Sequence, residues 1–287
     1  GCRIYTFVTT LRYVLEEAAR HGKSVWVLDR PNPVGRPVEG LRLRPGFESF
    51  VGAGPLPMRH GLTMGELARW FVATFGIDVD CRVVEMSGWK PAAAPGYGWP
   101  LGERSWINPS PNVPRLSSAR CYPGTVMVEG TTLSEGRGTT RPFELVGAPD
   151  VDTAALITKM HELAPQWLRG CALRACWFEP TFHKHVGKLC AGVQIHADVD
   201  HDHARFQPWR LQALMFKALR KLEPKYPLWR DFPYEYESGR PAIDVINGSD
   251  LLRRWVDDPR STPRDLEDLA SADERTWRRE RRAFLLY

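Results

Sequence analysis

The sequence lacks the features that assign many proteins to a class at once. Its six cysteines are scattered and include no CxxC pair, which argues against a zinc ribbon or a compact disulfide framework. It contains no GxSxG elbow, no phosphate-binding P-loop and no HExxH helix. No apolar run is long enough to span a membrane. We therefore expect free buried thiols, with one bridge among Cys171, Cys176 and Cys190 as the alternative.

An excess of charge of one sign is also missing. The 39 basic and 34 acidic residues give a net charge of +5 over 287 residues, and the two signs are interspersed. The densest basic run is RTWRRERR (275–282), and Trp277, Phe284 and Leu285 have the spacing of a helix with one face on a core. We expect a solvated helix face there and no nucleic-acid partner, with nucleic-acid binding as the alternative.

Histidines cluster in the sequence, but without the spacing of a metal site. Imidazoles and carboxylates gather in HKH (183–185) and in HADVDHDH (196–203), and both groups are good metal ligands. His201 and His203 fall in an expected turn, however, and no fixed-face pattern joins them. We predict no metal and no other cofactor.

The first half of the chain alternates helix and strand patterns. Residues 9–23 predict a helix, with an apolar face made of Leu11, Val14, Leu15 and Ala18. The run SVWVLD (24–29) is continuously apolar, as in strands of parallel sheets. Residues 62–76 predict a second helix, which begins with a capping box between Thr63 and Glu66.

Two more strands are predicted at 79–86 and 125–130, the second around a short buried run from Thr125 to Val128. Alternation of this kind indicates an α/β fold with a mostly parallel sheet. The pattern changes after residue 147. We predict a first domain over residues 1–147 and a smaller α+β domain over residues 148–287.

The second domain is expected to contain a helix capped by Asp152, two strands at 171–180 and 190–199, and an amphipathic helix at 207–222. The strand around GVQIHADV alternates between two faces, with Val193, Ile195, Ala197 and Val199 on one and Gln194, His196 and Asp198 on the other. The polar face, including His196, is therefore a candidate wall of a cleft.

Proline and glycine crowd two long connections, residues 29–40 and 89–116. Long irregular segments in compact domains are usually functional or disordered, and the tryptophans of the second connection argue against disorder. We interpret both connections as walls of a cleft. Trp89, Trp99 and Trp106 are candidates to stack on a ligand, and anchoring of their own loop is the alternative.

One segment concentrates polar chemistry, VEGTTLSEGRGTTRPFE at 128–144. We expect it to leave a strand, with Glu129 at the strand's carboxyl end, where ligands bind in open α/β sheets. It offers hydroxyl groups, carboxylates and the forked donors of Arg137 and Arg141, which suit a polyhydroxylated ligand with an anionic group. A polar loop held by its own salt bridges is the alternative.

Several long motifs, taken together, resemble a known family. They are RIYTFVTTLRYVLEEA, VLDRPNPVGRPVEG, MRHGLTMGELARWF, SPNVPRLSSARCYPGTVMVEGTTLSEGRGTTRPFELVGAP, EPTFHKHVGKLCAGVQIH and the closing FLLY. The chain is similar to the exo-β-N-acetylmuramidase (NamZ-like) family of bacterial peptidoglycan recycling over nearly its whole length. One departure is that family members begin well upstream, with a Pro-Glu-His-Gly motif whose glutamate is a catalytic candidate. We therefore expect the first domain to be incomplete at its N-terminus.

The resemblance implies a Rossmann-like catalytic domain followed by a smaller auxiliary domain, with a cleft between them. It implies release of N-acetylmuramic acid from the non-reducing end of peptidoglycan fragments, so muropeptides are the expected partners. It also implies an extracytoplasmic location. A muropeptide-binding protein without catalysis is the alternative.

Glycoside cleavage usually uses two carboxyl groups, about 5 Å apart for retention or up to about 9.5 Å apart for inversion. Glu129 and Glu135 are the leading pair, and Glu16 and Glu39 are rivals. The substrate's 2-acetamido group is an alternative nucleophile. Arg30, Arg137 or Arg141 would bind the lactyl carboxylate. The remaining candidates for substrate binding carry amide, hydroxyl or imidazole groups: Asn32, Asn112, Ser134, Thr139, Thr140 and His196.

Overall fold

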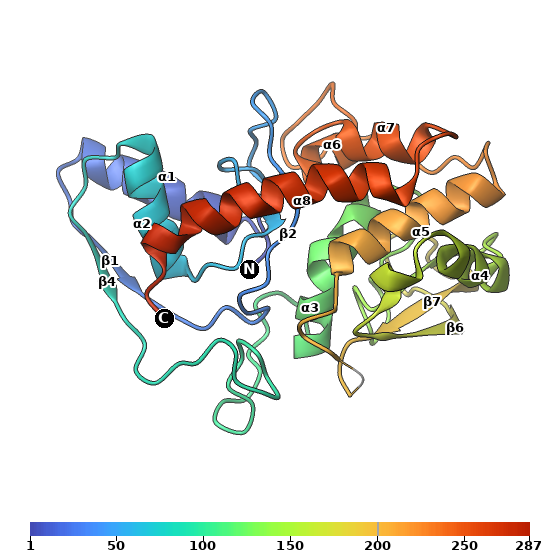
Figure 1. Cartoon of the computed structure of the whole chain (residues 1–287), viewed down its shortest axis with the longest axis horizontal. Helices are drawn as coiled ribbons and strands as arrows, with labels where there is room; N and C mark the ends of the chain where they lie inside the picture. The colour runs from blue at the N-terminus through green and yellow to red at the C-terminus, as the bar shows by residue number, and fades with distance from the viewer. Residues whose placement is uncertain (200) are drawn as a thin grey trace. The chain divides into compact units, whose positions relative to one another are not determined.

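The computed structural model describes residues 1–199 and 201–287 (Figure 1). The chain forms two compact units, Gly1–Ser105 with Ser271–Tyr287, and Trp106–Ala270. The boundary predicted between residues 147 and 148 lies inside the second unit. It crosses a strand that pairs with another strand of the same unit.

Two helices of the first unit follow the predicted patterns closely. Helix α1 (Phe7–Arg20) and helix α2 (Met64–Phe75) pack side by side (Figure 1). The capping box of α2 is present, because Thr63 accepts from the Glu66 backbone N–H and the Glu66 carboxylate accepts from that of Thr63. One detail of α1 is wrong, since Val14 is exposed while Val8 and Leu15 are buried.

The predicted parallel pairing is confirmed by strands β1 (Val25–Leu28) and β4 (Cys81–Val84). The expectation that β1 is buried on both faces is wrong, because Trp26 is 59% exposed and Leu28 is 72% exposed. Neighbouring side chains of a strand point to opposite faces, and only the face of Val27 packs on the core of the unit. Strands β2 (Glu39–Arg42) and β3 (Pro57–Arg59) form a separate antiparallel pair.

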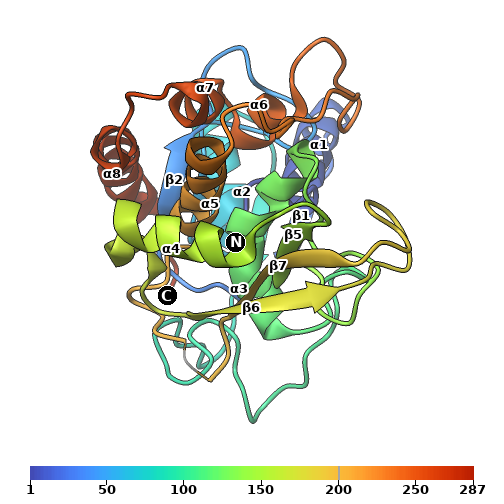
Figure 2. The ribbon, with the colours of Figure 1, turned by 90° about the vertical axis from the view of Figure 1, so that its right-hand side faces the viewer.

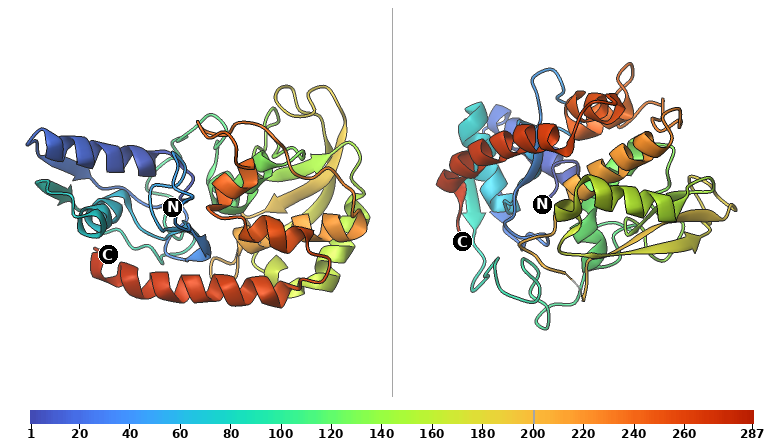
Figure 3. Two further views of the ribbon diagram at one scale, coloured as in Figure 1. Left: turned by 90° about the horizontal axis from the view of Figure 1, so that it is seen from above. Right: turned by 45° about the vertical axis from the view of Figure 1, so that its right-hand side comes forward.

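The core of the first unit is aromatic. Trp70 and Phe71 of α2 pack with Trp277, whose indole ring meets that of Trp70 edge to face at 5.3 Å. Trp277 lies near the end of helix α8 (Pro263–Glu280), which is continuous (Figure 3) and is followed by the short helix η3 (Arg281–Phe284). The predicted inward face of the basic run is therefore confirmed.

The second unit begins with a correction to the sequence analysis. Residues Thr125–Val128 are not a strand: helix α3 (Leu116–Thr125) runs directly into the 3₁₀ helix η1 (Val126–Gly130). Val126, Met127 and Val128 are all fully buried. A short apolar run that is buried all round has the same composition in either state, so periodicity cannot distinguish helix from strand.

This unit also contains an antiparallel sheet. Its strands lie in the order β5 (Leu145–Ala148), β7 (Cys190–His196), β6 (Ala172–Phe178). Helix α4 (Thr153–Leu163), capped by Asp152 as predicted, packs across β6 and β7 (Figure 2). Val193 and Ile195 face the core as expected, but Val199 lies beyond the strand and is 94% exposed.

The remaining elements of this unit are helices. The helix predicted at 207–222 is present as α5 (Pro208–Leu222), which contacts both α3 and α4, but its polar residues Arg210, Gln212 and Lys217 are buried, so it has no solvated polar face over these turns. The other elements are short: η2 (Pro165–Leu168), α6 (Ala242–Asn247) and α7 (Leu251–Asp257). Within the described ranges, every helix is too short or too polar to cross a bilayer. The six cysteines are free thiols, of which Cys81 and Cys171 are partly exposed and the other four are buried.

Candidate active site

The polar segment after η1 is held in a fixed shape by its own backbone and hydroxyl groups. Ser134 and Gly147 exchange backbone hydrogen bonds, which tie the segment to the start of the sheet. The Ser134 hydroxyl accepts from the Gly136 N–H, and the Thr139 hydroxyl donates to the Gly136 carbonyl. Ser134 and Thr139, both predicted to bind substrate, therefore have structural partners. Thr140 is exposed.

Arg137 joins the two carboxylates that the sequence analysis ranked first. Its Nη2 lies 2.6 Å from Oε1 of Glu129, in η1, and its Nε lies 3.1 Å from Oε1 of Glu135. The guanidinium also lies over the Phe143 ring, 4.9 Å from the centroid. The expected gathering of Glu129, Glu135 and Arg137 is thus present in the second unit.

Glu135 is a carboxylate with no solvent exposure and three basic neighbours. Besides Arg137, Lys184 Nζ lies 2.7 Å from Oε2 and His183 Nδ1 lies 3.3 Å from Oε1. Burial acts to raise the pKa of Glu135, but the contacts with His183 and Lys184 and the charge of Arg137 outweigh burial and lower the pKa to about 2. The group is therefore ionised at any pH near neutral.

The two basic neighbours of Glu135 arrive on the connection between β6 and β7, which extends beyond the ends of both strands (Figure 2). Thr181 bonds to the Gly138 carbonyl through both its N–H and its hydroxyl. A side chain at Gly138, where φ is +80°, would lie 2.7 Å from the backbone of Phe182. Glycine therefore permits the close approach of the two segments.

Tyr234 completes the group on the side of Glu129. Its hydroxyl donates to Oε2 of Glu129 over 2.7 Å, while Arg137 donates to the other oxygen. Burial, reinforced by the charge of Glu129, raises the pKa of Tyr234 well above its usual value. We call these six side chains the Glu135 cluster: Glu129, Glu135, Arg137, His183, Lys184 and Tyr234.

A second buried carboxylate, Glu144, lies at the end of the same segment. Its Oε1 accepts from the hydroxyls of Ser117 and Ser118 on α3, and its Oε2 lies 2.9 Å from Nη1 of Arg141. These bonds fasten the segment to α3. Arg141, a candidate for the lactyl carboxylate, is therefore already paired.

The predicted residues of the first unit have structural partners. The Asn32 amide, buried, donates to the carbonyls of Gly35 and Leu62 and accepts from the Val34 N–H. Glu16 pairs with Arg12 on α1 at 2.7 Å. Arg30 is exposed, and its backbone N–H donates to Asp29. The rival carboxylate Glu39 is buried in β2.

The three tryptophans of the long connection each anchor the local chain. The indole N–H of Trp89 donates to the Gly98 carbonyl, that of Trp99 to Arg104, and that of Trp106 to Val113. Each bond spans only 5 to 9 residues. The anchoring alternative is therefore confirmed for these side chains.

Two predicted binding residues of the second unit are partly exposed. Asn112 lies just before α3 and His196 at the end of β7. Asp200 of the histidine-rich turn lies outside the described residues. Over the rest of the chain, no group of three His, Cys, Asp or Glu side chains has the arrangement of a metal site.

Family models cover nearly the whole chain. The model described as "Exo-beta-N-acetylmuramidase NamZ, N-terminal" matches residues 1–117, and the corresponding C-terminal model matches residues 120–287. The chain belongs to the NamZ exo-β-N-acetylmuramidase family.

Individual relatives agree with this assignment. Peptidoglycan beta-N-acetylmuramidase NamZ of Bacillus subtilis (strain 168) is 36% identical over 291 residues, and this alignment covers 100% of the chain but 65% of the relative. Two DUF1343 family crystal structures from Bacteroides fragilis NCTC 9343 match 100% of the chain and 72% of their own. The first has a TM-score of 0.84 at 27% identity. The second, with 0.76 at 24%, supports the fold alone.

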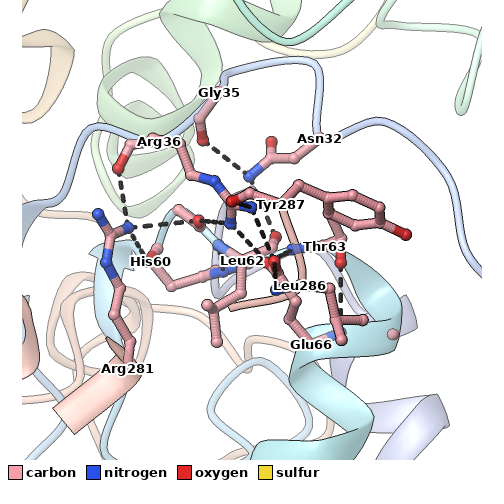
Figure 4. Close-up of polar contacts among 12 residues, drawn as sticks. Asn32, Gly35, Arg36, His60, Leu62, Thr63, Glu66, Arg281, Leu286 and Tyr287 are labelled. Atoms are coloured by element: carbon pink, nitrogen blue, oxygen red, sulfur yellow. Dashed lines mark hydrogen bonds and ion pairs between the residues drawn. The ribbon is translucent and has the colours of Figure 1, made fainter. Parts of the chain in front are cut away.

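The NamZ-family motifs of the first unit meet in one polar network (Figure 4). Arg36 binds both carboxylate oxygens of Glu66 and also donates to the carbonyls of Gly61 and Tyr287. The backbone N–H of Leu286 donates to Glu66 as well. The closing FLLY motif is therefore bound into the network of the two motifs around residues 28–40 and 58–71.

Sequence reasoning missed three members of the Glu135 cluster. His183 and Lys184 lie within the motif EPTFHKHVGK. That motif supported the family resemblance, and its histidines were considered only as metal ligands. Tyr234 lies in a stretch without a recognisable pattern.

Proposed function

We propose that this protein is a glycoside hydrolase that releases N-acetylmuramic acid from the non-reducing end of peptidoglycan fragments. Membership of the NamZ family supports this reaction, as does the name of the Bacillus subtilis relative, a peptidoglycan beta-N-acetylmuramidase. The chain spans 65% of the length of that relative, so its activity as it stands needs a direct test. An extracytoplasmic location stays a prediction from the family.

The observation that carries the proposal is the contact of Glu129, Arg137 and Glu135 within one unit. Two carboxylates close together are the usual machinery of glycoside cleavage. The low pKa of Glu135 makes it unsuited to donate a proton. We assign to Glu135 the role of a fixed negative charge, which stabilises positive charge that develops at the anomeric carbon or on a neighbouring side chain.

Arg137 is our candidate for binding the lactyl carboxylate. Its contacts with the two glutamates involve Nη2 and Nε, so Nη1 is the donor that we assign to the ligand. A guanidinium matches a carboxylate in both charge and geometry. We retain Thr140, His196 and Asn112 of the second unit as candidate contacts to the sugar.

The test is to incubate the purified chain with a chromogenic N-acetylmuramide and with the disaccharide of N-acetylmuramic acid and N-acetylglucosamine. We expect release from both, and loss of release when Arg137 is replaced by Lys. Arg254→Lys is the matched control, because Arg254 is an exposed arginine of the same unit. Saturable binding of the disaccharide without any release would instead identify a muropeptide-binding protein.

A further inference from the structure

His183 is the most exposed member of the Glu135 cluster. Its side chain is 40% exposed, whereas the Glu135 carboxylate behind it is fully shielded. The ring nitrogen that faces the carboxylate is Nδ1, at 3.3 Å from Oε1. Since the two ring nitrogens lie on opposite sides of an imidazole, Nε2 is directed away from the carboxylate.

The position of His183 is maintained against backbone strain. His183 has φ of +72° and His185 has φ of +59°, in the left-handed region that few residues other than glycine adopt, although Asn, Asp and His do so more often than the rest. Contacts on both sides hold this conformation. Lys184 donates to the carbonyls of Val128 and Thr131, and Nε2 of His185 lies 2.7 Å from the carbonyl of Thr132.

Strain of this kind costs on the order of 1–3 kcal/mol per residue and gathers at functional sites. At His183 this backbone conformation places one exposed imidazole directly in front of the buried, ionised carboxylate of Glu135. The same relationship orients the imidazole in hydrolases in which a buried aspartate binds Nδ1–H and leaves Nε2 free to exchange protons with the substrate.

We propose that His183 is the residue that transfers the proton in the glycosidic cleavage, and that Glu135 is a positioning residue that orients its ring. This inference rests on the proposed function and deepens it. The other charged groups around the pair are Lys184 and Arg137, which contact Glu135, and Glu129, which contacts Arg137. Lys184 and Arg137 balance the buried charge of Glu135, while the imidazole of His183 has one ring nitrogen that can donate a proton and another that can accept one.

The proposed step balances as follows. The bond from the anomeric carbon to the leaving oxygen breaks, and its electron pair stays on that oxygen, which takes the proton from Nε2 of the imidazolium. The nucleophile, either the substrate's 2-acetamido oxygen or a carboxylate, forms the new bond to the anomeric carbon. In the second half-reaction a water oxygen replaces the nucleophile, and the water returns a proton to Nε2.

The test varies the leaving group in the His183→Asn variant. Asparagine tolerates the positive φ at this position, so the backbone is expected to keep its shape. A 2,4-dinitrophenolate leaves without protonation, whereas a sugar hydroxyl does not. We therefore expect the variant to lose about 100-fold or more in kcat/KM, which reports the first half-reaction, on the disaccharide and less than about threefold on the dinitrophenyl glycoside. His161→Asn, at an exposed histidine of the same unit, is the control.

Equal losses on both substrates would overturn the assignment of His183 while leaving the proposed function in place. Failure of the wild-type chain to cleave either substrate would reject the proposed function itself. A second measurement does not depend on turnover. Long-range ¹H–¹⁵N correlation spectra should show His183 protonated at Nδ1 in its neutral form, and Glu135→Gln should weaken this preference. A neutral ring protonated at Nε2 would overturn the proposal.

Discussion

Lys184 Nζ lies 2.7 Å from Oε2 of Glu135, and the same ammonium group donates to two backbone carbonyls, those of Val128 and Thr131. An ammonium has three N–H donors, so each has a partner in the polar segment. Burial lowers the pKa of Lys184, although the charge of Glu135 acts in the opposite direction. The pair therefore joins the β6–β7 connection to the segment that carries the candidate carboxylates.

Removal of this ammonium should weaken the second unit. Lys184→Met keeps the length of the side chain but leaves Glu135 with less compensation for its buried charge. We expect the free energy of unfolding to fall by about 3 kcal/mol. Urea denaturation followed by circular dichroism measures this change. Lys188→Met, at an exposed lysine of the same connection, should change it by less than about 0.5 kcal/mol. Similar effects of the two substitutions would contradict the central role of the pair.

Acid should destabilise the protein partly through Glu135. Its pKa is about 2 in the folded protein, against an ordinary value of 4.5. Because the folded-state pKa is the lower one, this carboxylate contributes stability above about pH 4.5 and loses that contribution as the pH falls to about 2. The loss amounts to about 3 kcal/mol, on the basis of about 1.4 kcal/mol per pKa unit.

The comparison that isolates this effect is Glu135→Gln. Unfolding is measured between about pH 5 and pH 3 for both proteins, where the slope of stability against pH should be smaller for the variant. Other carboxylates titrate over the same range in both proteins, so their effects cancel in the difference. Parallel curves would show that Glu135 has the same pKa in the folded and unfolded chains.

Much of the fold follows from local patterns, and the exceptions have physical causes. Thr63 and Glu66 form the predicted capping box because the interaction is local, between residues three positions apart. The strand predicted from Thr125 to Val128 is wrong because a run of four buried residues, three of them apolar, contains no information about the elements that surround it. Here α6 packs against η1, and Gly130 contacts the backbone of Ile243 closely.

The candidate site was predicted only in part for a similar reason. Glu129, Glu135 and Arg137 lie within nine positions of one another, so a single polar segment indicated them. Tyr234 and Lys184 reach the same carboxylates from about 100 and 50 positions away. A single sequence contains no signal for contacts of that kind. Asn32 shows the converse, since backbone groups of Val34, Gly35 and Leu62 engage its amide, and the last of these lies 30 positions away.

A separate prediction concerns the first unit, where Arg36 and Glu66 bind the closing FLLY motif. Arg36 forms two parallel bonds with Glu66, which is fully buried, so Arg36→Lys keeps the charge but loses the forked geometry. We expect a loss of about 2 kcal/mol in stability, measured by thermal or urea unfolding. The control is Arg82→Lys, which affects an exposed pair with Asp80 and should cost less than about 0.5 kcal/mol. An equal cost at the two sites would mean that the network contributes little.

The contact between the polar segment and the β6–β7 connection can be tested at two glycines. Gly138 and Gly187 both have positive φ, +80° and +68°, so alanine strains the backbone at either position, by about 1 kcal/mol. Only at Gly138 does the new methyl group also meet backbone, 2.7 Å from the Phe182 nitrogen, whereas at Gly187 it meets nothing within 4 Å. Gly138→Ala should therefore displace Thr181 and His183 and reduce both stability and turnover of the disaccharide. Gly187→Ala should reduce stability slightly and leave turnover near the wild-type value. Equal turnover in the two variants would mean that the close contact between the polar segment and the β6–β7 connection does not determine the position of His183.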